Sequence, residues 1–320
     1  MTTPDRLTLA TRGSRLARVQ TDIVADLLRR EHPGIEIEVL IVTATGDRDT
    51  RPFAQIGAKG IFTSEVERAV IEGRADAAVH SAKDLTAELG PGCGIAAVPS
   101  RASAHDVVIG GEGTSGEDRL LGLPRGARVG TSSMRRRALL GELRPDLQAV
   151  EFRGNLDTRV AKVERREVDA AIVAAAGLER LGATIDVGAL DAERWVPAPN
   201  QGILAIEVLS ERGDIVELLR PMNDDAAWSE KLCERAFSAR LEGGCSVPLG
   251  CLARFNDGRL VATGFLGSPD GSMTLRDRVS GPHHQATVLG EQLADALLEA
   301  GGREILDSLE RSTVPEVVEP

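Results

Sequence analysis

Residues 6–28 read RLTLATRGSRLARVQTDIVADLL, and their periodicity changes within a few positions. Residues 6–10 are predicted to form a short strand. Ser14 then offers a helix cap, and the apolar residues after it recur at helical spacing; they are Leu16, Val19, Ile23, Val24 and Leu27. Strands and helices keep alternating to about residue 200, which predicts a doubly wound α/β sheet.

An arginine follows the predicted strand each time this transition recurs. Residues 127–130 lead into Thr131-Ser132-Ser133-Met134-Arg135-Arg136-Arg137, and residues 148–152 lead into Arg153-Gly154-Asn155, just as 6–10 lead into Arg12. Ligands of open α/β sheets bind at the carboxyl ends of strands, where helix N-termini offer unpaired N–H groups. A cation in the first helical turn opposes the helix dipole by roughly 0.3–1 kcal/mol. The recurrence therefore favours a bound anion.

Two interpretations of these arginines stay open. In the first they grip a carboxylate or phosphate with paired hydrogen bonds, and the absence of a Walker loop or a Gly-x-Gly-x-x-Gly motif favours a small polycarboxylate over a nucleotide. In the second they are solvated and pair with protein acids such as Glu142 or Asp146. Because consecutive helical residues point in different directions, we expect only two of Arg135, Arg136 and Arg137 to reach one ligand.

A further strand, predicted over residues 76–79, ends in His80-Ser81-Ala82-Lys83-Asp84-Leu85. A helix opened by a capping box, Ser64-Glu65-Val66-Glu67, and stopped at Gly73 precedes it. We expect Lys83 and Asp84 to reach the edge where the arginines gather, although a plain surface turn is the alternative. His80 is expected to be a packed histidine.

The composition excludes several classes of protein. The 320 residues carry a net charge of −11, with 2% aromatic residues and no tyrosine, which argues against a nucleic-acid surface. No apolar run of about 18 residues is present and the start lacks a signal-peptide core, so a cytoplasmic location is expected. The four cysteines form no zinc-ligand spacing, and no metal site is predicted.

The pattern of predicted strands and helices changes after about residue 221. A helix over 233–241 leads to Cys245, which two glycines precede and a proline follows, so a thiol stands on a tight turn. Three strands, near 247–255, 259–266 and 272–279, are joined by hairpin signals at Asn256-Asp257-Gly258 and Ser268-Pro269-Asp270-Gly271. A last helix over about 285–300 completes a small α+β domain.

Eight motifs in order make the chain resemble the hydroxymethylbilane synthase family, also called the porphobilinogen deaminase family. They are Thr11-Arg12-Gly13-Ser14, Gly57 to Phe62, His80 to Leu85, Gly130 to Arg136, Arg153 to Arg159, Ala174 to Leu181, Pro199-Asn200-Gln201-Gly202, and Glu234-Arg235-Ala236-Phe237 through Leu241 to Pro248. The chain departs from the family pattern at Ala102-Ser103-Ala104-His105, Asn200 and Ser64, which puts in doubt only local contacts of the domain hinge.

The resemblance implies the fold and the domains. It predicts two periplasmic-binding-protein-like (type II) α/β domains and a small α+β C-terminal domain. Carried onto this chain, domain one covers residues 1–102 and 201–220, domain two 103–200, and domain three 221–320. A mobile flap is expected over residues 46–60.

The resemblance also implies the activity and its residues. Four porphobilinogen molecules would be deaminated and joined head to tail on a dipyrromethane cofactor, bound through a thioether at Cys245, and the linear tetrapyrrole hydroxymethylbilane would be released with ammonia. Asp84 is the predicted catalytic residue. Predicted cofactor ligands besides Cys245 are Lys83, Ser133, Arg135, Arg136 and Arg159. Predicted substrate ligands are Arg12, Ser14, Arg153, Arg180, Gln201 and Phe62.

Two other functions are weighed against this one. A carboxylate-binding receptor or effector domain would suit a two-lobed fold but has no use for Cys245. A thiol hydrolase would need a histidine near Cys245, yet no histidine lies between His105 and His283. Beyond porphobilinogen and its polypyrrole products, we expect no nucleic-acid or membrane partner and a monomeric protein.

Overall fold

A computed structural model describes residues 4–43, 63–86, 88–242 and 247–313. The chain divides into two compact units. Unit 1 comprises Met1–His105, Ala174–Ile185 and Asn200–Leu232, and unit 2 comprises Asp106–Val173, Asp186–Pro199 and Cys233–Pro320.

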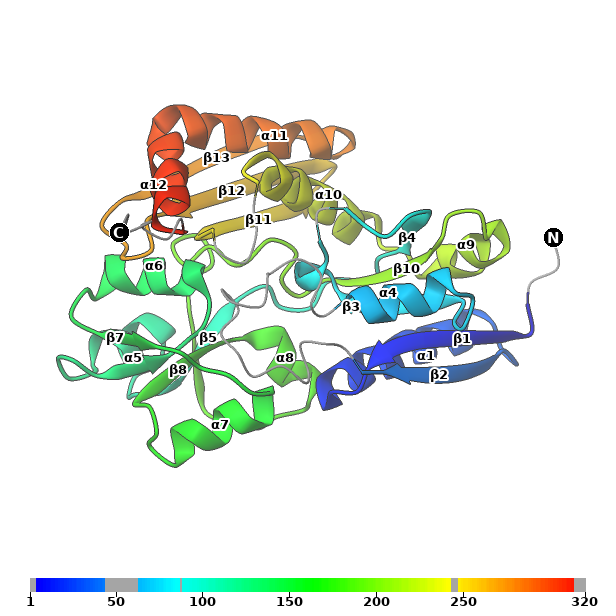
Figure 1. Cartoon of the computed structure of the whole chain (residues 1–320), viewed down its shortest axis with the longest axis horizontal. Coiled ribbons are helices and arrows are strands. Elements are labelled where there is room, and N and C mark those ends of the chain that lie inside the picture. Colours follow the sequence, from blue (N-terminus) through cyan, green and yellow to red (C-terminus); the bar gives the residue numbers. More distant parts are fainter. Residues whose placement is uncertain (1–3, 44–62, 87, 243–246, 314–320) are drawn as a thin grey trace, which may run out of the picture. The chain divides into compact units, whose positions relative to one another are not determined.

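Unit 1 is built on a five-stranded sheet in the order β2-β1-β3-β10-β4 (Figure 1). Its strands are β1 (Arg6–Arg12), β2 (Glu36–Val42), β3 (Ala77–Ser81), β4 (Cys93–Ala97) and β10 (Leu204–Leu209). β1 runs parallel to β2 and β3, whereas β10 runs antiparallel to both of its neighbours. The predicted strand–helix transition is confirmed, because β1 passes through a short turn into α1 (Arg15–Glu31) with Ser14 as its N-cap.

Helices α1, α4 (Ser64–Ile71), α8 (Ala175–Arg180) and α9 (Gly213–Leu219) complete unit 1. The apolar stripe of α1 packs with Leu7 and Leu9 of β1 and with Ile206 of β10 in one buried core. The predicted capping box of α4 is wrong. Thr63, not Ser64, is the N-cap, and it makes no side-chain cap bond. Glu67, the expected partner in the box, accepts the backbone N–H of Gly90 instead.

Unit 2 repeats the same arrangement in its five-stranded sheet, β7-β6-β8-β5-β9. The strands are β5 (Asp106–Gly110), β6 (Arg128–Gly130), β7 (Gln148–Val150), β8 (Ala170–Ala174) and β9 (Val187–Ala189); the helices beside them are α5 (Gly116–Leu121), α6 (Met134–Leu143) and α7 (Leu156–Glu164). In each sheet three parallel strands lie side by side, β2-β1-β3 and β7-β6-β8. The next strand, β10 or β5, is the first strand after the chain passes into that unit from the other. This order is that of type II periplasmic-binding-protein domains, as predicted.

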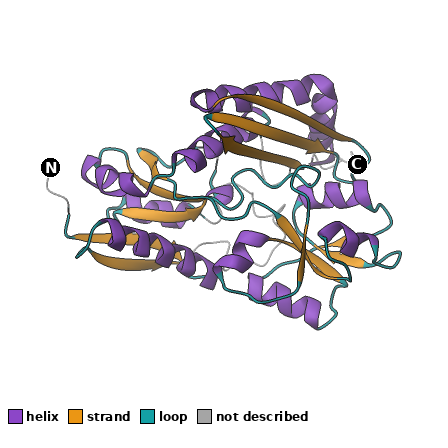
Figure 2. Cartoon of the chain, turned by 180° about the vertical axis from the view of Figure 1, so that it is seen from behind, coloured by secondary structure: helices purple, strands orange, loops and turns teal. Residues whose placement is uncertain are grey.

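The rest of unit 2 is a three-stranded antiparallel sheet with helices against it (Figure 2). Its strands are β11 (Leu249–Asn256), β12 (Arg259–Gly267) and β13 (Thr274–Pro282), and its helices are α10 (Asp225–Arg240, which begins in unit 1), α11 (Ala286–Leu297) and α12 (Arg303–Thr313). The predicted hairpin at Asp257-Gly258 is confirmed, since both residues take positive φ, 48° and 78°. The single final helix predicted over about 285–300 is incomplete. Gly301, with φ 111°, turns the chain into α12.

The predicted three-domain boundaries stay a prediction. Three sheets exist, as expected, but the second and third belong to the same compact unit. Residues 174–185, expected in domain two, and 221–232, expected in domain three, fall in unit 1.

Candidate active site

The Lys83–Asp84 turn of unit 1 follows directly on a buried strand. β3 ends at Ser81, and Ala82–Asp84 form one turn of 3-10 helix. The backbone N–H of Ala82 bonds to Ile203 O at 3.0 Å, which fixes the turn to the chain beside it. Lys83 and Asp84 are both exposed, and Lys83 Nζ donates to Gln201 Oε1 at 3.4 Å. Within the described part of the chain, the Asp84 carboxylate has no hydrogen bond or ion pair.

Arg12 and Ser14 flank the turn between β1 and α1. Arg12 is the last residue of β1, and the Ser14 hydroxyl accepts the N–H of Ala17 at 3.3 Å. Ser14 therefore has a structural task as a helix cap.

Arg180 and Gln201 hold the backbone of unit 1 near residues 200–202. Arg180 Nη2 donates to Gly202 O at 2.7 Å, and burial lowers the pKa of Arg180 to about 10. Gln201 Nε2 donates to Ala104 O at 2.8 Å, and the residue is 1% exposed. Gly202 is required here because its φ is +86° and a Cβ would lie 2.4 Å from Ala102 O.

His80 is the packed histidine that the sequence predicts. Its Nε2 lies 2.8 Å from Glu207 Oε2, and both side chains are almost fully buried. Burial alone would raise the pKa of Glu207, but the hydrogen bond and charge of His80 lower it. Burial raises the pKa of the nearby Glu67, and Glu207 adds to that rise. This cluster ties β3 to β10 beneath the Lys83–Asp84 turn.

Arg135 and Arg136 of unit 2 are buried against a protein carboxylate. Asp106, the first residue of β5, accepts Arg135 Nη2 at 2.8 Å and Arg136 Nη2 at 2.7 Å. A protein acid therefore pairs with both arginines, but it is one that was not predicted from the sequence. Burial lowers the pKa of the Arg135 guanidinium, Asp106 opposes this effect, and Arg136 adds to it.

The alternative acids named for these arginines are engaged elsewhere. Glu142 pairs with Arg276 of β13, and Asp146 pairs with Arg144. The pairing of Arg135 and Arg136 with Glu142 or Asp146 is therefore wrong. Arg137, the third arginine of the run, turns away to Glu151, as the helical geometry predicts.

The remaining predicted ligands of unit 2 lie at the starts of α6 and α7. Ser133 caps α6, where its hydroxyl accepts the N–H of Arg136 at 3.4 Å. Arg153 donates from Nε to Glu151 at 2.9 Å, and Arg159 donates from Nε to Gly154 O at 3.0 Å. Both residues are partly exposed.

The three cysteines that the structure describes are poor nucleophiles. Cys233 and Cys251 are fully buried, and burial raises the pKa of Cys233 to about 12. Burial and then Glu207 raise the pKa of Cys93 to about 12 as well. A thiol with so high a pKa carries almost no thiolate at neutral pH. Cys245, Phe62 and the predicted flap over 46–60 lie outside the described residues.

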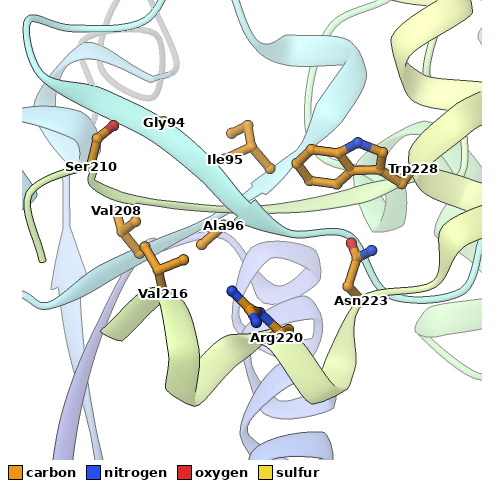
Figure 3. A pocket seen from close by; sticks show the side chains of 9 residues that line it. All are labelled: Gly94, Ile95, Ala96, Val208, Ser210, Val216, Arg220, Asn223 and Trp228. Atoms are coloured by element: carbon orange, nitrogen blue, oxygen red, sulfur yellow. The ribbon is translucent and has the colours of Figure 1, made fainter. Parts of the chain in front are cut away.

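A surface cavity of about 460 Å³ in unit 1 is separate from all of these residues (Figure 3). Residues of β4, β10 and α9 line it, together with Arg220, Asn223 and Trp228. No predicted site residue lines it. Among the described residues, no group of histidines, cysteines and acids could hold a metal ion.

Asp106 is the residue that the sequence reasoning missed. No role for it is predicted from the sequence. The signal that was available is an acidic residue at the start of a buried strand, DVVIG, where an unpaired carboxylate would be very unfavourable.

Unit 1 thus presents an exposed carboxylate, and unit 2 presents a cluster of arginines, two of which share one protein carboxylate. Comparison with known families identifies the chain. Residues 7–217 match the model of the porphobilinogen deaminase dipyrromethane cofactor-binding domain, and residues 228–299 match the porphobilinogen deaminase C-terminal domain. The chain belongs to the porphobilinogen deaminase family.

Curated relatives agree over almost the whole chain. It is 43% identical to porphobilinogen deaminase of Roseiflexus castenholzii, covering 94% of this chain and 98% of that protein. It is 42% identical to the probable porphobilinogen deaminase of Hyperthermus butylicus, covering 93% and 98%. Among solved structures, the methionine-binding protein MetQ matches 74% of this chain and 94% of its own at 11% identity and a TM-score of 0.42, a likeness that carries no functional argument.

The predictions of family, enzyme class and cofactor are thus confirmed. The chain is a transferase of tetrapyrrole biosynthesis with a dipyrromethane cofactor-binding domain. No helix in the described ranges is both long and apolar enough to cross a membrane.

Proposed function

We propose that the chain joins four porphobilinogen molecules head to tail on a dipyrromethane attached to Cys245, and releases hydroxymethylbilane and ammonia. The match of residues 7–217 to the dipyrromethane cofactor-binding domain carries this proposal. Relatives with the name porphobilinogen deaminase, matched over 98% of their length, support it.

The arginine cluster of unit 2 suits a cofactor that carries acetate and propionate groups. Arg135 Nε is buried and has no hydrogen-bond partner among the described residues, which is unfavourable for a buried donor unless an acceptor outside these residues satisfies it. A Cβ at Gly250 would lie 3.2 Å from Arg135 Cδ, so β11 passes directly over this arginine. Gly250 is five residues after Cys245, a distance of at most about 18 Å along an extended chain.

Several residues would hold the cofactor in this reaction. Arg135, Arg136 and Arg159 supply positive charge, and Lys83 and Ser133 supply further donors to its carboxylates. When bound, the dipyrromethane supplies the pyrrole carbon to which the first substrate unit is joined.

Asp84 is the proposed catalytic residue. Loss of ammonia from porphobilinogen leaves positive charge on its pyrrole ring, and an ionised carboxylate beside the pyrrole N–H would stabilise that charge. The Asp84 side chain is exposed, and no protein donor in the described ranges occupies it, so it can approach the substrate. A well-placed group of this kind contributes roughly 100-fold or more to the rate.

The remaining residues would bind the substrate and the growing chain through their carboxylates. They are Arg12, Ser14, Arg153, Arg180, Gln201 and Phe62. Arg180 and Gln201 would act partly by fixing the backbone of residues 104 and 202, as their hydrogen bonds suggest. We further propose that the protein works as a monomer in the cytoplasm and binds no nucleic acid, in keeping with its net charge of −11.

Intact-mass measurement of the native protein tests this function directly. The purified chain should carry a mass increment of two pyrrole units, and Cys245→Ser should abolish it, because an alcohol is a far weaker nucleophile than a thiol. Cys93→Ala is the matched control and should keep the increment, since burial holds the pKa of the Cys93 thiol at about 12. A full increment on the Cys245→Ser protein would refute the proposed attachment.

A further inference from the structure

The buried carboxylate of Asp106 accepts four hydrogen bonds. The residue is 1% exposed. Its Oδ2 accepts Arg135 Nη2 at 2.8 Å, Arg136 Nε at 3.1 Å and Trp195 Nε1 at 3.1 Å, and its Oδ1 accepts Arg136 Nη2 at 2.7 Å. Arg136 therefore holds Asp106 with its two-pronged fork, the geometry in which an arginine would otherwise grip a ligand carboxylate.

The two arginines are not equivalent. Arg136 donates from Nε and Nη2 to Asp106, and from Nη1 to Ile172 O at 2.9 Å. Arg135 gives one N–H to Asp106 and one to Val196 O, and its Nε has no partner in the described part of the chain. The unused Nε donor is therefore on Arg135, whereas Arg136 gives Nε and Nη2 to Asp106, although the sequence predicted the same role for both.

The charges of the cluster do not balance. Two guanidinium groups, 3% and 7% exposed, face one carboxylate, and no other acid of the described residues lies within ion-pair distance of either. One positive charge is left over, beside the positive end of helix α6. Because an unpaired buried charge is very unfavourable, a single ligand carboxylate would complete the cluster.

We propose that Asp106 is a positioning residue of the cofactor site: it locks Arg136, orients Arg135, and leaves the pair with one net positive charge that takes one carboxylate of the cofactor. This inference rests on the proposed function. It adds to that function a residue that touches neither cofactor nor substrate, and it assigns unequal tasks to the two arginines.

The test compares Asp106→Asn with Asp186→Asn. Asp186 also pairs with a buried arginine of unit 2, Arg119, at 2.6 Å, but it lies outside the proposed site. Apoprotein of each variant is mixed with preassembled hydroxymethylbilane, and attachment of the cofactor is followed by intact mass, with the melting temperature measured in parallel. We expect Asp106→Asn to load roughly 10- to 100-fold more slowly than the parent, as when the outer partners that orient metal ligands are lost. Asp186→Asn should load at the parental rate.

Rescue separates positioning from simple stability. Asp106→Glu keeps the charge and should recover part of the loading rate. Asp106→Asn with Arg136→Met keeps the net charge of the cluster at the parental value, so it should fold even if Asp106→Asn alone does not. It should still load slowly, because Arg135 keeps its bond to Val196 O but loses the carboxylate of Asp106.

Two outcomes have different meanings. Parental loading by folded Asp106→Asn, or by the folded double variant Asp106→Asn with Arg136→Met, would overturn the positioning role. A parent protein that takes up no dipyrromethane at all would instead refute the proposed function.

Discussion

Two aspartates, one in each unit, show how differently the same side chain is used. Asp84 is exposed on a short 3-10 turn after β3, with no bond to its carboxylate among the described residues. Asp106 is 1% exposed at the start of β5, and two arginines and a tryptophan donate to it. A buried carboxylate held by several donors fixes its neighbours, whereas an exposed one can meet a substrate.

The comparison separates chemistry from binding. Unit 1 presents a carboxylate that can act on charge developing in a ligand, and unit 2 presents cations whose positions are set before any ligand arrives. Preorganised charge is effective because little free energy is spent on reorientation during the reaction. The predictions below test each side of this contrast.

The largest effect should follow from breaking the buried pairs of Asp106. Arg136→Leu removes the fork and should lower the free energy of unfolding by about 3–5 kcal/mol, the range for a broken buried ion pair. Arg135→Leu leaves that fork intact, so it should lower stability less while still slowing cofactor loading. Chemical denaturation and intact mass measure the two effects.

Arg137→Leu is the control for this series. Arg137 is the next residue of α6 but pairs with Glu151, so its loss should change stability by no more than about 0.5 kcal/mol. Equal losses of stability for all three leucine variants would contradict the unequal tasks inferred from the structure.

A smaller effect is expected at the helix cap beside the arginines. Ser133→Ala removes the cap of α6 and should cost about 1 kcal/mol of stability. Ser115→Ala removes the cap of α5 and should cost a similar amount. Only Ser133→Ala should also slow cofactor loading, and identical loading by both variants would reduce Ser133 to a structural cap.

A small effect that depends on pH should appear at the other end of α6, where Glu142 pairs with Arg276. The hydrogen bond from Arg276 lowers the pKa of Glu142 below its ordinary 4.5, against the opposing effect of burial. A lowered pKa in the folded state stabilises the protein above about pH 4.5, and this contribution is lost as the pH falls through the folded value. Glu142→Gln should therefore lower the free energy of unfolding by about 1 kcal/mol or less near pH 7. The difference from the parent should vanish on acidification, and a difference that is constant with pH would contradict the pairing.

Much of the fold could be predicted because short stretches of sequence determine the strands, helix caps and turns. The pattern of residues 6–28 correctly predicted β1, the Ser14 cap and α1. The turn residues Asn256-Asp257-Gly258 correctly predicted the hairpin between β11 and β12. The capping box at Ser64 failed because Glu67 has a better partner, the N–H of Gly90, which lies 23 residues away in sequence. The residues after Gly301 were missed because a pair of glycines usually ends a helix, whereas here Gly301 only redirects it into α12.

The candidate site was predictable in its residue types but not in its pairings. Strand-end arginines were found from position alone. Their partner was not, because Asp106 precedes Arg135 by 29 residues and approaches it only through the order of the strands in the second sheet. Long-range contacts of this kind decide which arginine pairs with a protein carboxylate and which can bind a ligand. The hydrophobic periodicity of the sequence carries no information about them.

Single-turnover kinetics of Asp84→Asn tests the division between chemistry and binding most directly. The variant is first loaded with dipyrromethane from preassembled tetrapyrrole, then mixed with porphobilinogen, and the addition of each pyrrole unit is followed by intact mass. Asparagine keeps the shape of the side chain but removes its charge, while the arginines of unit 2 are untouched. We expect normal loading and pyrrole addition slowed by roughly 100-fold or more, with Asp84→Glu less impaired because the charge survives. Addition at the parental rate by Asp84→Asn would contradict the catalytic role of Asp84.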